Sequence, residues 1–438
     1  MNKKGHAKKS ISQDVTELHR LYQGKIQIVP KCAIRNYQDF SIWYTPGVAK
    51  PCKRIKKNKK LVYHYTNKWN TIAIVSDGSR VLGLGDIGPE ASLPVMEGKA
   101  LLFKYLGGID AFPICLATKE PDQIIQAVKW IQPSFGGVNL EDIAKPKCFY
   151  ILERLKEELE IPVWHDDQQG TATVTLAGLI NALKIVDKKL SEVTICLIGA
   201  GAANIAIAKL LIKAGVKPGN IILTDSKGII HSDRKDIRSD AQKWEMSLIT
   251  NTERRKGHIP EAMKGTDVCI ACSKPEPGII RKEWVRSMAK NSILFACANP
   301  LPEIWPHEAM EAGARIVATG RSDFPNQINN SLGFPGIFRG VLDVKAKKIT
   351  DEMCIAAAYE LANYAERKGL SEKYIIPRMD EWDVFPKEAA AVGTKAIEQK
   401  LAETRYTYDQ LYRRAFSIIK KSRKALEVLI SKNIIPTW

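Results

Sequence analysis

Two pairs of neighbouring carboxylates are the residues of this sequence best suited to bind a metal ion. Glu141 and Asp142 follow the strand-like run VNL, and Asp166 and Asp167 follow the apolar run PVWH. Converging carboxylates without a cysteine or histidine cluster suit a hard divalent cation, Mg²⁺ or Mn²⁺. Each pair alone is also compatible with a helix N-cap or a turn. Because each pair follows a strand, we favour a metal site and interpret His165 as a packed side chain.

Two further residues have side chains that could move protons. Tyr44 precedes a Pro-Gly turn in WYTPGVAKPC, and Lys99 lies early in a predicted helix among apolar residues. Burial and neighbouring cations lower the pKa of a lysine toward the pH at which a general base works. Either residue alone is also compatible with a structural role, a packed ring for the tyrosine and an outward-pointing chain for the lysine.

The segment LIGAGAAN predicts a dinucleotide-binding turn, because it follows a strand-like run and opens a helix. Gly199 allows the tight turn, and Gly201 lets the backbone approach a pyrophosphate at the helix N-terminus. Asn204 occupies the third position of this pattern, where glycine or alanine is usual. The predicted cofactor-binding residues are Gly199, Ala200, Gly201, Ala202, Ala203, Asn204, Asp225 and Ser226.

Asp225 ends the next predicted strand, at the position where an acidic residue accepts hydrogen bonds from the ribose hydroxyls. Its charge would repel the 2′-phosphate of NADP, which favours NAD. Lys227 and Arg234 follow closely and could hold that phosphate, so NADP stays possible.

The elements that must position these residues alternate between strands and helices. Strand-like runs at 70–78, 110–118, 220–228, 266–272, 291–300 and 314–320, and another at the start of the segment 192–215, are separated by helical patterns. This alternation predicts an α/β protein, with a mixed α/β N-terminal domain and a doubly wound parallel sheet of Rossmann type. The region after about residue 351 is predicted to be mostly helical, and TATVTLAGLINALKIV to be a long apolar helix that connects the two domains.

Composition and charge limit the class of protein. The chain has 438 residues, of which 45% are hydrophobic and 26% charged, with a net charge of +18. These values are typical of a globular protein and exclude a disordered tail or a collagen. The nine cysteines lie mostly in apolar runs, which favours reduced, packed thiols. Without a secretory signal or an apolar stretch of about 18 residues, the sequence predicts a cytoplasmic location.

Several long blocks occur in the order found in the malic enzyme family, and the sequence resembles the shorter, prokaryotic-type members over about residues 20–400. The blocks are YTPGVAKPC, DGSRVLGLGDIGPEASLPVMEGKALLFK, DAFPICL, GGVNLEDIA, HDDQQGTA, IGAGAA, ANPLPEI and ATGRSDFPNQINNSLGFPGIFRG. This resemblance implies an NAD(P)-dependent malate dehydrogenase (oxaloacetate-decarboxylating), which converts (S)-malate to pyruvate and CO₂ and reduces NAD(P). It also implies a homodimer or a higher homo-oligomer.

The resemblance assigns roles to residues at matching positions. Tyr44 matches the general acid of the family and Lys99 the general base. The matching metal ligands are Glu141, Asp142 and Asp167, which makes Asp166 a neighbour of the metal shell. Arg80 resembles an arginine that clamps a substrate carboxylate. The residues that resemble those touching the nicotinamide ribose and the substrate are Asn299, Asn329 and Asn330.

The resemblance also predicts the domain boundaries of the chain. Residues 1–19 are predicted to be a basic arm, 20–165 the N-terminal domain with the catalytic tyrosine and lysine, and 166–400 the NAD(P)-binding domain. Residues 401–438 are a basic helical extension beyond what the short form leads us to expect. Gln169 stands where bacterial members usually have histidine, which concerns the surroundings of the metal and not its binding.

Alternatives of two kinds stay open. The chain could be another two-domain NAD(P)-dependent dehydrogenase, or a variant that yields lactate from malate. The basic runs at 50–60 and 412–430 could also bind nucleic acid or a membrane surface. We interpret those runs as solvated faces, and we expect neither specific nucleic-acid binding nor membrane association.

Overall fold

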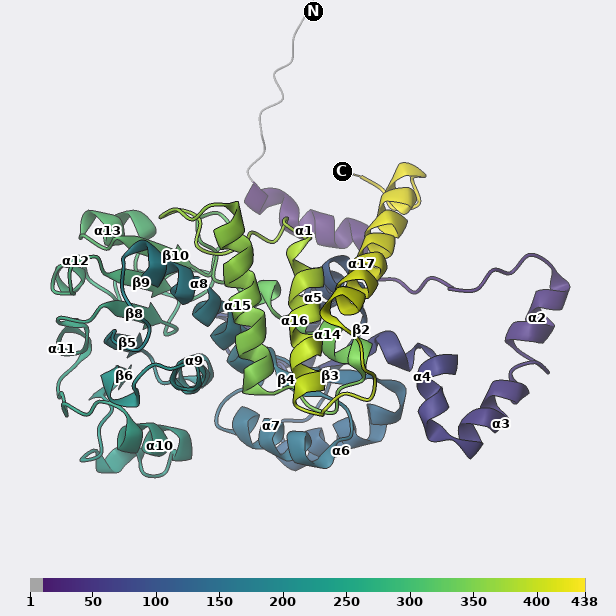
Figure 1. Cartoon of the computed structure of the whole chain (residues 1–438), viewed down its shortest axis with the longest axis horizontal. Coiled ribbons are helices and arrows are strands. Elements are labelled where there is room, and N and C mark those ends of the chain that lie inside the picture. The colour runs from purple at the N-terminus through teal and green to yellow at the C-terminus, as the bar shows by residue number, and fades with distance from the viewer. Residues whose placement is uncertain (1–10, 438) are drawn as a thin grey trace, which may run out of the picture.

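In the computed structural model of the chain, residues 11–437 are described, and they form two sheets with helices around them (Figure 1). The strands are parallel except for β7, which pairs antiparallel with β6 at the edge of the second sheet. The first sheet has the order β2-β1-β3-β4 and the second the order β10-β9-β8-β5-β6-β7. The predicted α/β fold with a Rossmann-type domain is confirmed. The first sheet consists of β1 (Thr71–Ser76), β2 (Asp110–Cys115), β3 (Gly137–Leu140) and β4 (Val163–His165). The second consists of β5 (Ile195–Ile198), β6 (Ile221–Asp225), β7 (Gly228–Ile229), β8 (Val268–Ala271), β9 (Ile293–Ala296) and β10 (Ile316–Thr319).

Helices connect the strands and cover the sheets. Three helices alternate with the strands of the first sheet along the chain and cover it. They are α5 (Gly88–Gly107), α6 (Pro121–Ile131) and α7 (Lys147–Glu158). The helices of the second domain are α9 (Ala202–Lys213), α10 (Ala241–Ile249), α11 (Ile259–Met263), α12 (Lys282–Arg286) and α13 (Pro306–Glu311). Between the sheets lie the π-helical turn η4 (Asp166–Gly170) and α8 (Thr171–Ile185), whose residues 172–183 are all buried. The predicted connecting helix therefore exists, and it is buried all round because it packs against both α9 and α15.

Parallel pairing brings the carboxyl ends of the strands to one edge of the first sheet. β3 pairs with β4 in a register that places Leu140 beside His165, and β1 pairs with β3 so that Val75 lies beside Leu140. The next residues of β3 and β4 are the two acidic pairs. Strand pairing alone therefore makes Glu141 and Asp166 neighbours.

The C-terminal quarter of the chain returns to the N-terminal domain. It contains α14 (Phe334–Val344), α15 (Asp351–Lys368), α16 (Val384–Glu398) and α17 (Tyr408–Ser431). Both α14 and α17 pack on α5, and Arg414 of α17 donates to the buried carboxylate of Asp343 at 2.8 Å. The predicted C-terminal extension is thus a covering helix of the N-terminal domain.

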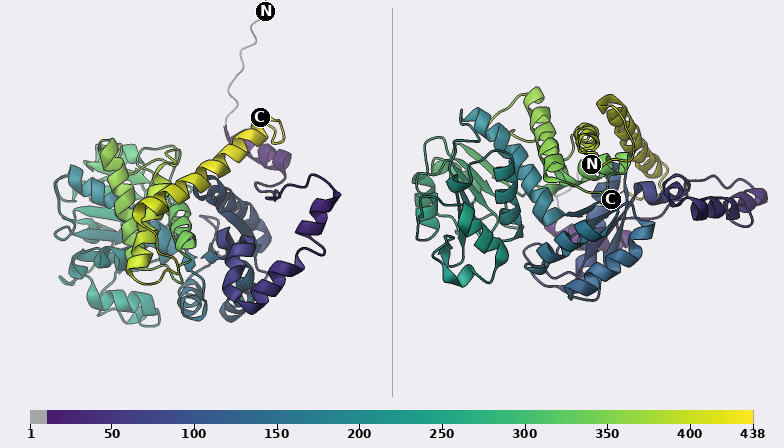
Figure 2. Two further views of the ribbon diagram at one scale, coloured as in Figure 1. Left: turned by 45° about the vertical axis from the view of Figure 1, so that its right-hand side comes forward. Right: turned by 60° about the horizontal axis from the view of Figure 1, so that its bottom comes forward.

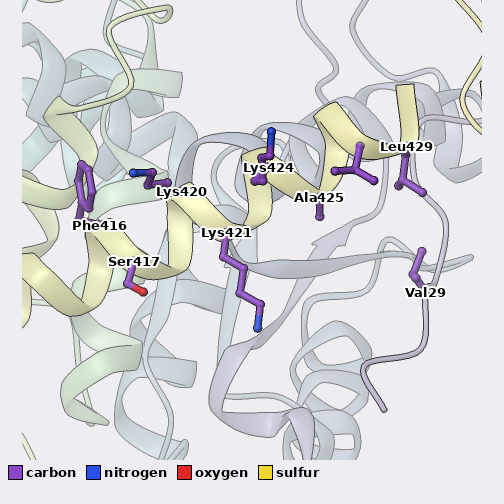
Figure 3. A pocket seen from close by; sticks show the side chains of 9 residues that line it. Val29, Phe416, Ser417, Lys420, Lys421, Lys424, Ala425 and Leu429 are labelled. Carbon is purple, nitrogen blue, oxygen red and sulfur yellow. The ribbon is translucent and has the colours of Figure 1, made fainter. Parts of the chain in front are cut away.

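The outer face of α17 borders an open groove of about 710 Å³ next to the segment that follows α1 (Figure 3). Buried Leu411, Ala415 and Ile419 hold the helix on the body, while the groove side mixes apolar and basic residues. The residues that line it are Val29, Phe416, Ser417, Lys420, Lys421, Lys424, Ala425, Val428 and Leu429.

An N-terminal segment projects from the body. We call residues 33–58 of this segment the projecting arm; they include α2 (Tyr37–Trp43) and α3 (Ala49–Lys57) (Figures 1 and 2). The short helix α4 (Val62–Tyr65) follows the projecting arm. Lys31 pairs with Asp110 at 3.1 Å at the base of the arm. The predicted basic arm at 1–19 is different: residues 1–10 lie outside the described residues, and α1 (Ile11–Tyr22) shows that the remainder is helical.

Among the helices that the structure describes, none combines the length and the apolar character needed to cross a lipid bilayer.

Candidate functional site

The lysine predicted to act as a base lies inside the acidic cluster. The Lys99 ammonium, on α5, donates to Glu141 Oε1 at 2.6 Å and forms a second ion pair with Asp166. The lysine is 8% exposed and both carboxylates are buried. The structure therefore brings Lys99 together with residues that follow two different strands of the first sheet.

Three of the carboxylates form the geometry that a metal ion needs. Each of Glu141, Asp142 and Asp167 offers one oxygen, and these oxygens lie within 4.8 Å of one another. The backbone N–H of Asp142 donates to Asp167 Oδ2 at 3.0 Å, which fixes one ligand against another. These are the three ligands that the resemblance implied.

The backbone at Asp142 is strained in a way that serves this cluster. Its φ of 53° is in the left-handed region, which a side chain other than glycine rarely adopts. Such conformations are concentrated at functional sites, where the surrounding structure over-determines them. Here the carbonyl of Asp142 accepts from the Arg80 N–H at 3.0 Å, so the loop after β1 holds the turn after β3.

The cluster fits a divalent cation on two counts. Burial, together with the charge of Asp167, raises the pKa of Glu141 to about 7 and that of Asp142 to about 9. The oxygen Asp142 Oδ2 is buried and has no hydrogen-bond partner among the described residues. A divalent cation would satisfy that oxygen and neutralise the repulsion between the carboxylates.

The surroundings of Lys99 differ from the sequence prediction. We expected burial and neighbouring cations to lower its pKa, but its nearest charged partners are carboxylates. Burial lowers the pKa of the ammonium, yet Asp166 and Glu141 outweigh it and hold that pKa above its ordinary value. As the structure stands, Lys99 is a protonated, ion-paired lysine.

Three residues that the sequence analysis did not select support this cluster. Asn139 Nδ2 donates to Glu141 Oε2 at 2.9 Å, and Trp164 Nε1 donates to Asp166 Oδ1 at 3.1 Å. The Lys99 ammonium lies 4.7 Å from the ring centroid of Phe334, at the start of α14. Asn139 and Trp164 stand two residues before the carboxylates they contact, a spacing that could have identified them because alternate residues of a strand share a face.

His165 is a packed side chain, as predicted. It is fully buried in β4, and burial lowers its pKa to about 3. It is therefore a neutral imidazole, 3.7 Å from Asp167.

The glycine turn has the geometry of a dinucleotide site. Gly199 has a φ of 97°, and a side chain there would meet the Cys272 carbonyl at 2.9 Å. A Cβ on Gly201 would meet nothing within 4 Å, so the space above the start of α9 is open. Both observations match the roles predicted for these glycines.

Asn204, the departure from the usual pattern, stabilises this turn. Its side chain is fully buried, and its Nδ2 donates to the carbonyls of Ile198 and Gly199, both at 2.8 Å. The amide thus ties the first turn of α9 to the end of β5.

The glycine turn also lies beside the metal-ligand loop. Lys145, three residues after Asp142, donates to the Ala200 carbonyl at 3.1 Å. The two sites predicted from separate parts of the sequence are therefore in contact.

Asp225 ends β6, as predicted, and is held by two cations. Arg234 donates to both its oxygens at 2.8 and 3.1 Å, and Lys243 donates at 2.7 Å. Although burial opposes them, these hydrogen bonds lower the pKa of Asp225 to about 2. Lys243 was not selected from the sequence, because it reaches Asp225 from α10.

The predicted substrate residues lie around the same edge. A side chain at Gly170 would meet Asn330 Cβ at 3.2 Å, and Asn329 donates to the Gly320 carbonyl at 3.3 Å. A side chain at Gly320 would meet Asn299 Nδ2 at 2.5 Å, so the asparagines belong to adjoining loops. Burial raises the pKa of Asp167, and the charge of Arg80 opposes this rise, which places the guanidinium within electrostatic reach of the cluster.

Tyr44 is the predicted site residue that this chain does not bring to the cluster. It ends α2 in the projecting arm and is 72% exposed (Figure 1). Its neighbours in the arm are also exposed apolar residues, among them Tyr37, Phe40 and Trp43.

The chain is similar to known proteins in sequence and in structure. The family described as "Malic enzyme, N-terminal domain" matches residues 23–156, and "Malic enzyme, NAD binding domain" matches residues 168–397. A solved malic enzyme from Entamoeba histolytica is 49% identical, with a TM-score of 0.95 over 97% of this chain and 89% of that one.

Two bacterial proteins are similar over most of their lengths. The "Bifunctional malic/malolactic enzyme" of Bacillus subtilis is 51% identical over 393 residues, which are 90% of this chain and 95% of that protein. The "NAD-dependent malic enzyme" of Geobacillus stearothermophilus is 52% identical over 379 residues, 86% of this chain and 78% of that protein. Together with two domain matches that cover most of the sequence, these similarities place the chain in the malic enzyme family.

Proposed function

We propose that this chain catalyses the metal-dependent oxidative decarboxylation of (S)-malate to pyruvate and CO₂, with reduction of NAD. The observation that carries this proposal is the contact between a lysine–carboxylate cluster and a dinucleotide turn, joined by Lys145. Family membership supports it and disfavours the alternative of an unrelated two-domain dehydrogenase.

Glu141, Asp142 and Asp167 would hold the divalent ion, which we propose to be Mg²⁺ or Mn²⁺ because all three donors are carboxylate oxygens. When bound, such an ion acts as a Lewis acid toward the oxygens of the substrate. Hydrogen bonds with Arg80 and Asp167 hold Asp142 in its left-handed backbone conformation, so this chain presents the ligands in a pre-formed arrangement.

The reaction requires a proton acceptor, a proton donor and an anion clamp. With the charge of the carboxylates offset by a bound divalent ion, Lys99 would release its proton to solvent, and its neutral amine would accept the C2 hydroxyl proton while hydride leaves C2 for the nicotinamide. Asp166, which accepts from Trp164, orients the Lys99 side chain together with Glu141. After CO₂ leaves, Tyr44 donates a proton to C3 of the resulting enolate of pyruvate. Arg80, Asn299, Asn329 and Asn330 hold the substrate and the nicotinamide ribose.

Tyr44 would reach this cluster from a second copy of the chain. The arm exposes Tyr37 (86%), Tyr44 (72%) and Trp43 (52%), more aromatic surface than a free segment of a soluble protein usually leaves to water. A homodimer in which the arm packs against the partner subunit would cover this aromatic surface. The same contact would bring Tyr44 to the lysine–carboxylate cluster of the partner subunit. The homodimer predicted from the sequence is therefore part of this proposal, and so is the cytoplasmic location.

NAD is the proposed cofactor. Asp225 is an ionised carboxylate at the end of β6, where it would accept from the ribose hydroxyls and repel a 2′-phosphate. NADP stays possible because Arg234 and Lys243 are adjacent.

A steady-state assay tests the whole proposal. Malate is supplied with NAD or NADP, each with and without Mn²⁺, and the products are identified by NMR. We expect pyruvate, a dependence on Mn²⁺ and a preference for NAD. Lactate as the product, or turnover that persists in EDTA, would contradict the proposed reaction.

A further inference from the structure

Lys145 brings a positive charge of the first domain to the glycine turn of the second. It lies in the loop after β3, three residues beyond Asp142, and its Nζ donates to the Ala200 carbonyl at 3.1 Å. Ala200 stands between the two glycines of the turn at the start of α9. The proposed reaction uses the metal ligands of this loop but gives Lys145 no role.

The partner of this ammonium is a neutral group. Among residues 11–437, no carboxylate lies within ion-pair distance of Lys145, and the Ala200 carbonyl is its hydrogen-bond acceptor. A charged donor forms a stronger hydrogen bond with an anion than with a neutral carbonyl. Part of the lysine side chain is exposed, so a ligand can reach it. An anion bound at the glycine turn would therefore be a better acceptor than the carbonyl that Lys145 now contacts.

The charges around Lys145 place it near the adenosine side of the dinucleotide site. Partial burial lowers the pKa of its ammonium and Lys243 lowers it further, whereas Asp240 and Asp225 oppose this change. Asp225 ends β6, and the other two residues lie at the start of α10. Lys145 is thus within electrostatic reach of the carboxylate proposed to bind the adenosine ribose, while its ammonium contacts the turn.

The turn itself can receive an anion next to this lysine. A Cβ on Gly201 would meet nothing within 4 Å, so the space at the start of α9 is open. No side chain caps this helix at Gly201, which leaves its first N–H groups for a ligand. In a domain of this type the pyrophosphate of the dinucleotide binds at that position. The pyrophosphate is therefore the anion that the open turn and the Lys145 ammonium would share.

We propose that Lys145 binds the pyrophosphate of the dinucleotide and gives up its hydrogen bond to the Ala200 carbonyl when it does so. This inference deepens the proposed function, because it rests on dinucleotide binding at the glycine turn. Lys145 is a cofactor-binding residue that the second domain does not itself contain. The contact would join the loop of the metal ligands to a cofactor held by the other domain.

The test measures how the full chain, in EDTA, binds two fragments of the cofactor. ADP-ribose contains the pyrophosphate and is measured by calorimetry, and adenosine lacks it and is measured by saturation-transfer NMR. Lys145→Met removes the charge, Lys145→Arg keeps it, and Lys213→Met removes an exposed lysine from the last turn of α9 as the matched control. Far-UV circular dichroism shows that each variant is folded.

We expect the affinity for ADP-ribose to fall at least about tenfold in Lys145→Met, because a hydrogen bond between charged groups is lost. The loss should be smaller in Lys145→Arg and absent in Lys213→Met. The affinity for adenosine should be the same in all three variants and in the unaltered chain. NAD and NADP should be weakened equally by Lys145→Met, since both contain the pyrophosphate.

Three results would overturn the inference. ADP-ribose could bind Lys145→Met as tightly as the unaltered chain. Adenosine could lose as much affinity as ADP-ribose, which would show that Lys145 shapes the turn and does not bind the pyrophosphate. The variant could weaken NADP alone, which would place Lys145 at the 2′-phosphate. In each case the unaltered chain still binds ADP-ribose, whereas failure of the proposed function at this turn would abolish that binding as well.

Discussion

The Lys99 ammonium lies 2.6 Å from Glu141 Oε1, so the proposed base and a proposed metal ligand share one ion pair. Both groups are buried, and a second carboxylate, Asp166, contacts the same ammonium. A change at any of the three alters the charge that surrounds the other two. The effects of single substitutions here will therefore not be additive.

Replacing Lys99 by methionine tests the proton acceptor. We expect turnover of malate to fall about 10²–10⁴-fold, the usual contribution of a general base. NAD binding, measured by nucleotide fluorescence, should be retained because the glycine turn does not contact Lys99. Lys104→Met, a half-exposed lysine of the same helix, is the matched control. Wild-type turnover in the Lys99 variant would refute the assignment.

Replacing Asp142 by asparagine tests the metal site. We expect the affinity for Mn²⁺, measured by calorimetry, to fall at least about tenfold, because a charged ligand is lost. Asp187→Asn is a close control, since Asp187 also has a positive φ (54°, against 53° for Asp142) and is exposed away from the cluster. Equal Mn²⁺ affinity in the two variants would contradict the proposed ligand set.

Mixing two inactive variants tests whether Tyr44 acts across the dimer. Tyr44→Phe and Lys99→Met are each expected to be inactive. If the arm supplies Tyr44 to the partner, half of a random mixture is heterodimer, and each heterodimer has one complete site. About a quarter of the wild-type activity should then return after subunit exchange. No recovery, with exchange confirmed by native mass spectrometry, would show that Tyr44 acts within its own chain.

Replacing Asp225 by serine tests the choice of nucleotide. The change removes the carboxylate that repels a 2′-phosphate and leaves Arg234 and Lys243 free to bind it. We expect the ratio of kcat/KM for NADP to that for NAD to rise at least about tenfold. Asp236→Ser is the control, since Asp236 also pairs with Arg234 but lies outside the end of β6. The same shift in both variants would mean that freeing Arg234 is sufficient.

Glu388 makes the stability of the protein depend on pH. Both of its carboxylate oxygens are buried without a hydrogen-bond partner among the described residues. Burial, with a smaller contribution from Glu360, raises its pKa well above the ordinary value of 4.5. Above pH 4.5 the unfolded chain therefore releases this proton while the folded chain keeps it, so the free energy of unfolding falls as pH rises.

Glu388→Gln keeps the size of the side chain and replaces its carboxyl group by an amide, which does not titrate. We expect the variant to gain thermal stability relative to the wild type as pH increases from about 5 to 8. Scanning calorimetry of both proteins at each pH measures this difference. A constant difference in Tm over that range would contradict the buried, protonated carboxyl. Glutamine suits the site because Glu388 packs directly against Gly336, where a larger group would not fit.

The sequence predicted the features that depend on residues close together along the chain. The glycine turn, Asp225 at the end of its strand and the two acidic pairs are each fixed by a strand and the residues that follow it. Contacts between distant segments were not predictable in this way. Lys243 reaches Asp225 from another helix, and Phe334 reaches Lys99 from a segment more than two hundred residues later.

Charge was also harder to predict than position. Lys99 was predicted to lie on a helix among apolar residues, and it does, but the sign of its pKa shift depends on which charges face it. Those neighbours are set by the pairing of β3 with β4, which no local pattern specifies. The position of Tyr44 was likewise not predictable from a local pattern. It is 72% exposed, so contacts within this chain do not determine its role.

The return of α14 and α17 to α5 has a consequence for biosynthesis. The first domain is synthesised before these helices, because α14 begins only at Phe334. Until α14 and α17 have been made, α5 exposes the surface that they later bury. The packing of the first domain is therefore completed only by segments that follow the second sheet along the chain.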